Sequence, residues 1–445
     1  AVMESAGMPF DVVGLGELVK MWRAEIAAVE IDARAHMPSR SMPNLRSAVQ
    51  VAKLVEGQLT EQDRRSWPRT PCGALRTDSA TLRRSDLPFA RCVARYRELH
   101  HSLSHYEPYR AAAAASGRLF PVYQLCGAVT GRMTCARPNL HGTPRDPAFR
   151  ALVAVPFGAQ LVKGDFSQIE LRVLAEVSGD ARMRAAFAKG SDLHRLTAST
   201  LLGIPGDEVT AEERQLAKAV NFGLIFGQSA GGLQRYAASS YGVELQLKEA
   251  VAARRGFFEA YAGVALWQEE QRRRVGSGVP VVTPGGRMAH HLVEAWREVM
   301  ADGALTNGQQ SSRGSADLKS PAAAAAALKR LEREALNFPI QGGAAEVMLA
   351  CLDRLRLWLP PSPPGRLGGG GSTECCCRLV GVVHDEFLLE CSDVRVADRV
   401  AGILQTCMAE AWSLVFPAAA PLGLDGVTIA VGSSWAELAP WKGRA

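Results

Sequence analysis

Two aspartates stand where a carboxylate could do chemistry. Asp165 follows residues 161–164 (Leu-Val-Lys-Gly), a short run that predicts a strand, and Asp385 lies between two apolar runs that predict a hairpin with acids at its tip. A carboxylate beside a buried strand is costly unless a counter-charge neutralises it. If the two residues meet in space, they could hold one or two Mg²⁺ ions through oxygen ligands. The alternative is that each aspartate simply caps a turn.

A second candidate is one face of a helix predicted over residues 211–226. Four residues recur there at a spacing of four: Arg214, Lys218, Phe222 and Phe226. Because four helical steps drift by only ~40°, these residues share one face. Two cations and an aromatic ring could bind a triphosphate and stack on a base. The alternative is an amphipathic helix with solvated cations and core aromatics, but Gly223 and Gly227, each costing ~1 kcal/mol in a helix, indicate a close approach.

The segments around these residues predict the elements that would position them. Ser167 followed by Glu170, and Thr210 followed by Glu213, match the capping box that begins a helix. Residues 283–286 (Thr-Pro-Gly-Gly) indicate a hairpin turn. Apolar spacing predicts further helices over residues 12–35, 45–59 and 87–109.

Composition sets outer limits on the function. The net charge of +6 fits a polyanionic partner without proving one. No apolar run approaches the ~20 residues of a membrane span, and no CxxC pair indicates a zinc site. Residues 61–88 are expected to form loop and short turns. The Gly-, Ser- and Ala-rich residues 301–327 and the Pro- and Gly-rich residues 360–372 are expected to be mobile insertions.

Three segments, in the same order along the chain, resemble motifs A, B and C of the family A DNA polymerases, the DNA polymerase I family. They are residues 165–172 (DFSQIELR), residues 214–223 (R-xxx-K-xx-NFG) and residues 383–386 (VHDE). Further segments resemble the same family, at residues 96–99, 130–132, 138–140, 192–195 and 333–342. The resemblance covers nearly the whole chain apart from the two insertions, and the ordered set is far more specific than any one motif.

The resemblance implies an α+β fold, the right-hand polymerase, with an antiparallel palm sheet and helical fingers and thumb. The expected divisions are an N-terminal helix at residues 1–39, the thumb at 40–118, the palm at 119–177 and 331–445, and the fingers at 178–330.

The resemblance also implies the catalytic groups. Asp165 and Asp385 would ligate two Mg²⁺ ions, with the backbone carbonyl of Phe166 as a further ligand. Lys218 would neutralise the phosphates and could protonate the leaving group. Glu386 would be a secondary acid of the catalytic site.

Binding roles carry over in the same way. The incoming deoxynucleotide (dNTP) is expected among seven side chains: Arg214, Lys218, Phe222, His194, Gln168, Glu170 and Phe226. Glu170 would act as the steric gate, the side chain that excludes a ribose 2′-hydroxyl. Primer–template DNA is expected to contact six residues: Arg132, Asn139, Arg333, Asn337, Gln341 and His384. The minor-groove acceptors are common to all base pairs, so these contacts would sense pairing geometry.

These roles predict a template-directed DNA polymerase that adds dNTPs to a primer 3′-hydroxyl by two-metal nucleotidyl transfer. One alternative is a catalytically inactive remnant that binds primer–template DNA. Another is a single-subunit RNA polymerase, against which Glu170 argues. The expected partners are DNA and dNTPs, with no membrane and a monomeric state. The expected location is intracellular, in a bacterium, a phage host or an organelle, and this chain has no room for an exonuclease domain.

Several positions depart from the family pattern. Phe226 stands where Tyr is usual and cannot donate the hydroxyl hydrogen bond commonly made to the gate glutamate. His101 and Leu103 replace lysines common in the thumb, which weakens the expected phosphate contacts. That weaker primer grip leaves room for a processivity factor as a further partner. His141 and Val382 replace two glutamines.

Overall fold

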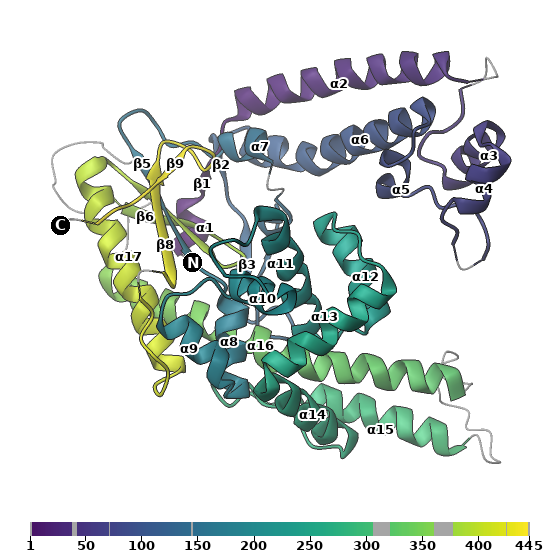
Figure 1. The fold of residues 1–445 in the computed structure, drawn as a ribbon. Helices are drawn as coiled ribbons and strands as arrows, with labels where there is room; N and C mark the ends of the chain where they lie inside the picture. Colours follow the sequence, from purple (N-terminus) through teal and green to yellow (C-terminus); the bar gives the residue numbers. More distant parts are fainter. Residues whose placement is uncertain are drawn as a thin grey trace.

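The computed structural model describes residues 2–443 apart from residues 38–41, 71, 144–145, 306–320, 360–376 and 424. Its centre is an antiparallel sheet with five strands in the order β6-β7-β5-β8-β9 (Figure 1). Their bounds are β6 Cys377–Val383, β7 Glu386–Cys391, β5 Gln160–Phe166, β8 Val427–Gly432 and β9 Leu438–Pro440. Two small sheets pair β1 (Met8–Pro9) with β2 (Arg118–Leu119) and β3 (Val122–Gln124) with β4 (Thr134–Ala136).

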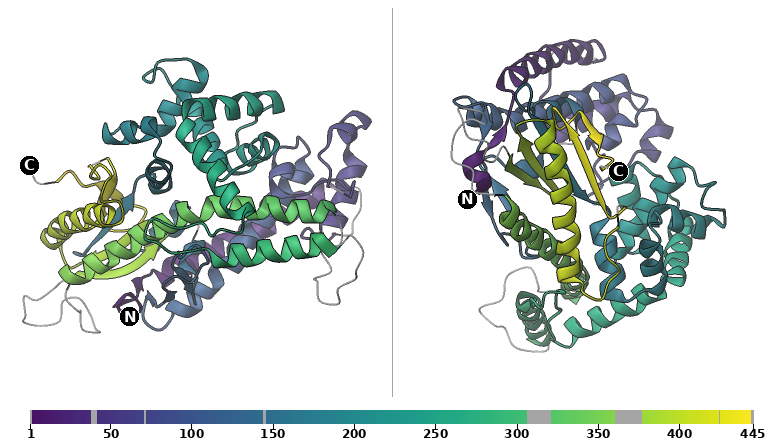
Figure 2. Two further views of the ribbon diagram at one scale, coloured as in Figure 1. Left: turned by 90° about the horizontal axis from the view of Figure 1, so that it is seen from below. Right: turned by 90° about the vertical axis from the view of Figure 1, so that its left-hand side faces the viewer.

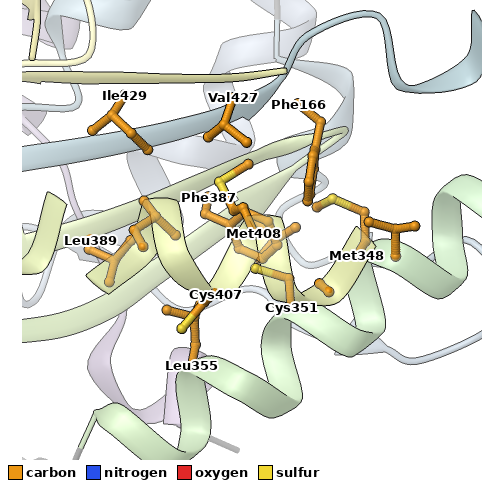
Figure 3. Close-up of a cluster of buried hydrophobic side chains, with 14 of the residues drawn as sticks. Phe166, Met348, Cys351, Leu355, Phe387, Leu389, Cys407, Met408, Val427 and Ile429 are labelled. Atoms are coloured by element: carbon orange, nitrogen blue, oxygen red, sulfur yellow. The ribbon is translucent and has the colours of Figure 1, made fainter. Parts of the chain in front are cut away.

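One face of the central sheet packs on two helices, α16 (Pro321–Trp358) and α17 (Val394–Val415). Figure 3 shows Phe166 and Phe387 from the strands meeting Met348 and Cys351 of α16 and Met408 of α17. Because side chains alternate along a strand, burial of the Phe166 side chain turns that of Asp165 to the opposite face. The apolar core thus fixes the direction in which the candidate metal ligand points.

A helical region lies beside the sheet and carries the cationic helix face. Its elements are α8 (Ile169–Ser178), α9 (Ala181–Ala188), α10 (Leu193–Leu202), α11 (Ala211–Ile225), α12 (Ala230–Tyr236), η2 (Ala237–Tyr241), α13 (Leu247–Ala260), α14 (Ala262–Gly276) and α15 (His290–Leu305). A second core of buried apolar residues holds α8 to α14 together. Figure 2 shows α15 lying along the outer half of α16.

The other helical region extends away from the sheet in Figure 1. Its elements, with the short helices that join it to the sheet, are α1 (Val2–Ala6), α2 (Val12–Ala35), α3 (Ala48–Gln58), α4 (Glu61–Ser66), α5 (Ser79–Arg83), α6 (Pro88–Ala113), η1 (Leu140–Gly142) and α7 (Pro147–Ala151). Helices α2 and α6 pack along each other, so the predicted N-terminal helix forms one body with the helical region after it. Helices α4 and α5 lie where only loop and turns were expected.

The local predictions had mixed outcomes. The capping box of α11 is confirmed, since Thr210 accepts from the Glu213 N–H while Glu213 accepts from that of Thr210. The capping box at Ser167 and Glu170 is wrong: α8 begins after Gln168, which has a left-handed backbone and makes no side-chain cap. Ser167 instead contacts Thr428 at 3.0 Å, because the β5–β8 pairing brings the two hydroxyls together.

The hairpin turns are confirmed. The Gly286 N–H donates to the Thr283 carbonyl at 2.9 Å, and β6 and β7 form the hairpin with acids at its tip. The prediction of a mobile loop over residues 301–327 is wrong at both ends, because α15 reaches Leu305 and α16 begins at Pro321. A run of alanines has the highest helix propensity and here continues a buried helix. The second predicted insertion, residues 360–372, lies outside the described residues.

Helix α16 is long and apolar enough to cross a membrane by length and composition alone, over Ala322–Trp358. However, 67% of the tested window is buried inside the fold. A core helix passes the same test, and the packing of α16 against the sheet and α17 accounts for its apolar sequence.

Candidate active site

The structure brings the two predicted aspartates together at one end of the sheet. Strand pairing places Asp165 of β5 opposite Glu386 of β7, and the Phe166 N–H donates to the Asp385 carbonyl at 3.4 Å. Burial raises the pKa of Asp165 to about 6, and the charges of Glu386 and Asp385 add to this although Lys163 opposes it. Carboxylates held this close are unfavourable without a cation.

The donor set suits a magnesium site that shares its ligands with a substrate. Among the described residues, no group of three or more His, Cys, Asp or Glu side chains could enclose a metal. Mg²⁺ is ordinarily bound by one or two carboxylates together with substrate phosphates and water, rather than by an all-protein cage. Asp165 and Asp385 fit that pattern, and the raised pKa of Asp165 marks the charge that a cation would relieve.

Glu386 is tied to the protein. Its Oε2 accepts from the Trp435 indole at 3.0 Å, and its Oε1 lies 3.5 Å from Lys163 Nζ and 3.7 Å from Arg150 Nη2. Arg150 also lies over the Trp435 ring, 4.3 Å from its centroid. None of these three partners was among the predicted site residues. The sequence does contain a signal for Lys163: it lies two residues before Asp165 on a predicted strand, so both side chains point to the same face. No local pattern indicates that Arg150 or Trp435 lies near Glu386.

Glu170, the predicted steric gate, forms an ion pair with Arg132, which was expected to contact DNA. The Glu170 carboxylate is mostly buried, with 15% of its side chain exposed. Burial raises the pKa of Glu170, Arg132 opposes that shift, and the charge of Asp385 adds to it. The gate residue and a candidate primer-contacting residue are therefore coupled directly in the DNA-free protein.

Three of the four residues predicted to share a face lie on α11, and the fourth, Phe226, is the C-cap just after the helix. All four are half-buried, while their neighbours Ala217, Val220 and Leu224 are buried. Gly223 is needed for helix packing: a Cβ there would lie 2.8 Å from Leu233 of α12. The close approach that the glycine indicated is thus between two helices.

The cations and polar groups near α11 already have protein partners. Arg214 Nε donates to Asp192 Oδ2 at 2.6 Å. His194 is 2% exposed, its Nδ1 lies 2.9 Å from Asn221 Nδ2, and its ring lies 5.7 Å from that of Phe222. Burial lowers the pKa of His194 to about 4, so the imidazole is neutral at pH 7. As a phosphate ligand, His194 would act as a hydrogen-bond donor and not as a charge.

Two of the predicted DNA-contacting residues, Arg132 and His384, line a hollow next to Asp385. This cavity of about 50 Å³ is lined by Arg132, Met133, His141, Ala345, Met348, Leu349, His384 and Asp385. His384 is exposed at the hairpin tip, and its ring stacks on that of His141 at 5.8 Å. Asn139 lies just beyond, where its side chain caps η1 by accepting from the His141 N–H.

The remaining candidates for DNA contact all lie on α16. Arg333, Asn337 and Gln341 are spaced by four along α16, so they share one face. The buried Oδ1 of Asn337 and Oε1 of Gln168 have no hydrogen-bond partner among the described residues. Because an unpaired buried acceptor is costly, both atoms are suited to a ligand that donates to them.

An acid-bearing antiparallel sheet flanked by two helical regions defines a right-hand polymerase fold, and comparison with known proteins identifies its family. Residues 14–437 match DNA polymerase family A. The chain is 32% identical over 419 residues to DNA polymerase I of Aquifex aeolicus, covering 93% of this chain and 62% of that relative. It is 30% identical over 437 residues to the thermostable DNA polymerase I of Thermus thermophilus, covering 95% of this chain and 46% of that relative.

A solved structure agrees with the sequence relatives. The POL domain of Pol1 from M. smegmatis, in complex with DNA primer-template and dNTP, matches with a TM-score of 0.75 at 25% identity, covering 98% of this chain and 68% of that chain. The chain therefore belongs to DNA polymerase family A. It spans 62% of the Aquifex enzyme and 46% of the Thermus enzyme. Polymerases of this family are generally metal-dependent.

Proposed function

We propose that this chain is a template-directed DNA polymerase domain that joins dNTPs to a primer 3′-hydroxyl by nucleotidyl transfer with two Mg²⁺ ions. The observation that carries the proposal is the meeting of Asp165 and Asp385 at the end of the sheet, where like charges are held together and no further described His, Cys, Asp or Glu side chain completes an enclosing set of ligands. Membership of family A and the likeness to a polymerase domain bound to primer-template and dNTP support it.

In this proposal the palm is residues 119–177 and 331–445, the fingers are 178–330 and the thumb is 40–118, with residues 1–39 forming its N-terminal helix. The packing of α2 on α6 favours treating residues 1–118 as one moving body. Primer–template DNA would lie across the hollow between Arg132 and His384, with its minor groove toward Arg333, Asn337 and Gln341 of α16. Such contacts sense base-pair geometry without reading sequence.

Asp165 and Asp385, with the carbonyl of Phe166, would hold the two ions. The ions would supply activation of the 3′-hydroxyl and charge stabilisation of the leaving pyrophosphate. Lys218 is the candidate to neutralise the phosphates and to protonate the pyrophosphate. Arg214 would exchange Asp192 for a phosphate oxygen, and His194 would donate a hydrogen bond while neutral.

Glu170 would exclude ribonucleotides by occupying the space of a 2′-hydroxyl. The ion pair with Arg132 holds its carboxylate in place and opposes the rise in its pKa that burial causes. Phe222 would pack on the sugar and base, and Gln168 offers an unpaired acceptor beside them.

Single-nucleotide incorporation on a primed template tests the proposal. We expect Mg²⁺-dependent addition of the complementary dNTP and at least ~10²-fold poorer addition of the matching ribonucleotide, since a steric clash opposes the 2′-hydroxyl. Tight primer–template binding with no incorporation would instead favour the inactive remnant. Equal use of ribonucleotides would contradict the gate assigned to Glu170.

A further inference from the structure

A lysine lies between the candidate metal ligand and the acid beside it. Lys163 and Asp165 are two residues apart on β5, so both side chains leave the same face of the sheet. Lys163 Nζ lies 3.6 Å from Asp165 Oδ2 and 3.5 Å from Glu386 Oε1. With only 16% of its side chain exposed, Lys163 is confined between these two carboxylates.

Glu386 is also held by two residues other than Lys163. The Trp435 indole donates to its Oε2 at 3.0 Å, and Arg150, lying over that indole, approaches its Oε1 at 3.7 Å. These contacts hold the Glu386 carboxylate within reach of Lys163 whether or not Asp165 has another ligand. Lys163 therefore has two alternative partners. Glu386 is held in place by other residues, and Asp165 is the carboxylate that a metal would need.

An ammonium and a divalent cation compete for the same carboxylate. Lysine carries three donors and no acceptor, on a flexible stem, so its head can pivot between partners. Two cations at ~4 Å from each other repel strongly where solvent is restricted. A metal on Asp165 thus has to displace the ammonium, and Glu386 provides the place to which it can withdraw.

We propose that Lys163 is a positioning residue that serves as the resident counter-cation of Asp165 and raises the metal concentration that the site requires, with Glu386 as the anchor for its ammonium. The inference rests on the proposed function, because it takes Asp165 as a metal ligand. It assigns Glu386 a role through Lys163 in place of direct work in catalysis.

Binding of Mn²⁺ to the chain without DNA or nucleotide tests this, measured by electron paramagnetic resonance of the free ion. Lys163→Met keeps the length of the side chain and removes its charge, and we expect a dissociation constant about tenfold lower, equivalent to ~1.4 kcal/mol. Lys163→Arg keeps the charge and should stay near the parent value. Unchanged or weaker binding in Lys163→Met overturns the inference. Lys163→Gln provides the same test if the methionine variant does not fold by circular dichroism.

Two further variants separate the possible failures. Asp165→Asn should abolish the measured site. If Mn²⁺ still binds to Asp165→Asn, the proposed metal site itself is wrong. If Mn²⁺ binding depends on Asp165 but is unchanged in Lys163→Met, only the role proposed for Lys163 is wrong. Glu386→Gln should weaken Mn²⁺ binding in the parent, since the ammonium then stays on Asp165, and should weaken it less in the Lys163→Met background. Equal weakening in both backgrounds contradicts the anchoring role of Glu386.

Discussion

The acid end of the sheet and the cationic face of α11 differ in how their charges are balanced. At the sheet, strand register forces Asp165 and Asp385 together, and the pKa of Asp165 is raised to about 6 as a result of burial and like charge. Along α11, Arg214 is neutralised by Asp192. At the sheet a divalent cation would meet clustered carboxylates but must displace Lys163 from Asp165, whereas along α11 an incoming anion must displace Asp192 from Arg214.

This contrast has a functional consequence. A cluster of like charges is preorganised for a divalent cation, because the entering ion relieves the repulsion among the carboxylates as well as pairing with them. A site whose charges are already paired gains only the difference between its new partner and its old one. The sheet therefore suits a permanent catalytic centre, whereas the α11 face suits a substrate-binding surface that changes partners as the nucleotide arrives and leaves.

The largest expected effect comes from removing one of the two candidate metal-binding carboxylates. Asp165→Asn and Asp385→Asn should each lower primer extension by at least ~10³-fold, because each removes a metal ligand where charge develops during the reaction. Single-turnover incorporation measures the loss. Primer–template affinity, measured by fluorescence anisotropy, should change by less than ~threefold. Retention of extension in both variants would contradict the assignment of the metal site.

A smaller effect is expected along α11, with opposite signs for the two partners of one ion pair. Arg214→Ala should raise the KM for dNTP by ~10- to 100-fold, the worth of a charge-assisted hydrogen bond of ~1.5–3 kcal/mol. Asp192→Asn keeps the helix cap of α10, since asparagine caps as well as aspartate. It frees Arg214 from its acid and should lower the KM. Steady-state kinetics with one dNTP measures both.

The comparison fails if both variants raise the KM by the same factor. That result would mean that the Arg214–Asp192 pair positions α11 as a unit and does not compete with the nucleotide. The double variant decides the matter, because competing roles predict an effect close to that of Arg214→Ala alone.

Stability should also separate the two regions. The pKa of Asp165 is raised from 3.8 to about 6, so the folded state binds more protons than the unfolded state between these values. The contribution of Asp165 to the stability of the metal-free protein is therefore complete below about pH 4 and is lost as the pH rises through 6. The full shift corresponds to ~3 kcal/mol, but solvent screens a side chain that is a third exposed, so we expect Asp165→Asn to stabilise by ~1 kcal/mol at pH 7. Urea unfolding in EDTA measures this.

His194 of the α11 region should behave in the opposite direction. Burial lowers its pKa from 6.5 to about 4, so its contribution to stability is complete above pH 6.5 and is lost as the pH falls toward 4. Between about pH 4 and 6 the two groups therefore act with opposite sign. His194→Gln should remove a loss of stability as the pH falls, and Asp165→Asn should remove a loss of stability as the pH rises. Identical profiles for the two variants would show that neither group controls the pH dependence.

The sequence predicted those features that depend on local periodicity. The shared face of Arg214, Lys218, Phe222 and Phe226 follows from helical geometry, and the hairpin carrying Asp385 follows from two apolar runs around an acidic turn. Motif order added the right-hand fold, which no single segment could supply. The α8 capping box failed because Glu170 found a stronger partner in Arg132, 38 residues earlier in the chain.

What the sequence could not supply were the partners brought by tertiary structure. Trp435 reaches Glu386 only because β8 pairs beside β5, and Arg150 reaches it from a short helix before the sheet. The alanines at the start of α16 were assigned to a loop by composition, although their helix propensity and the packing of α15 on α16 both favour a helix. The partners of Glu386, by contrast, are set by long-range contacts that no local pattern indicates.

The smallest expected effect concerns Phe226. Family members commonly have tyrosine there, with its hydroxyl on the gate glutamate, but Glu170 in this chain already accepts a charged hydrogen bond from Arg132. Phe226→Tyr would add a neutral hydrogen bond of at most ~0.5–1.5 kcal/mol to a carboxylate that is already satisfied. We therefore expect less than ~threefold change in the preference for dNTP over ribonucleotide, measured as the ratio of kcat/KM values.

The same substitution becomes informative when Arg132 is absent. Arg132→Ala leaves the Glu170 carboxylate mostly buried without its cation, which should loosen the gate and reduce sugar discrimination. In that background Phe226→Tyr should recover part of the loss, because its hydroxyl is then the better donor. A tenfold gain in the parent, or no recovery in the Arg132→Ala background, would mean that the gate is not held by Arg132. The side chain at position 226 would then control the position of Glu170. Glu170 would in that case belong with the α11 face and not with the acid end of the sheet.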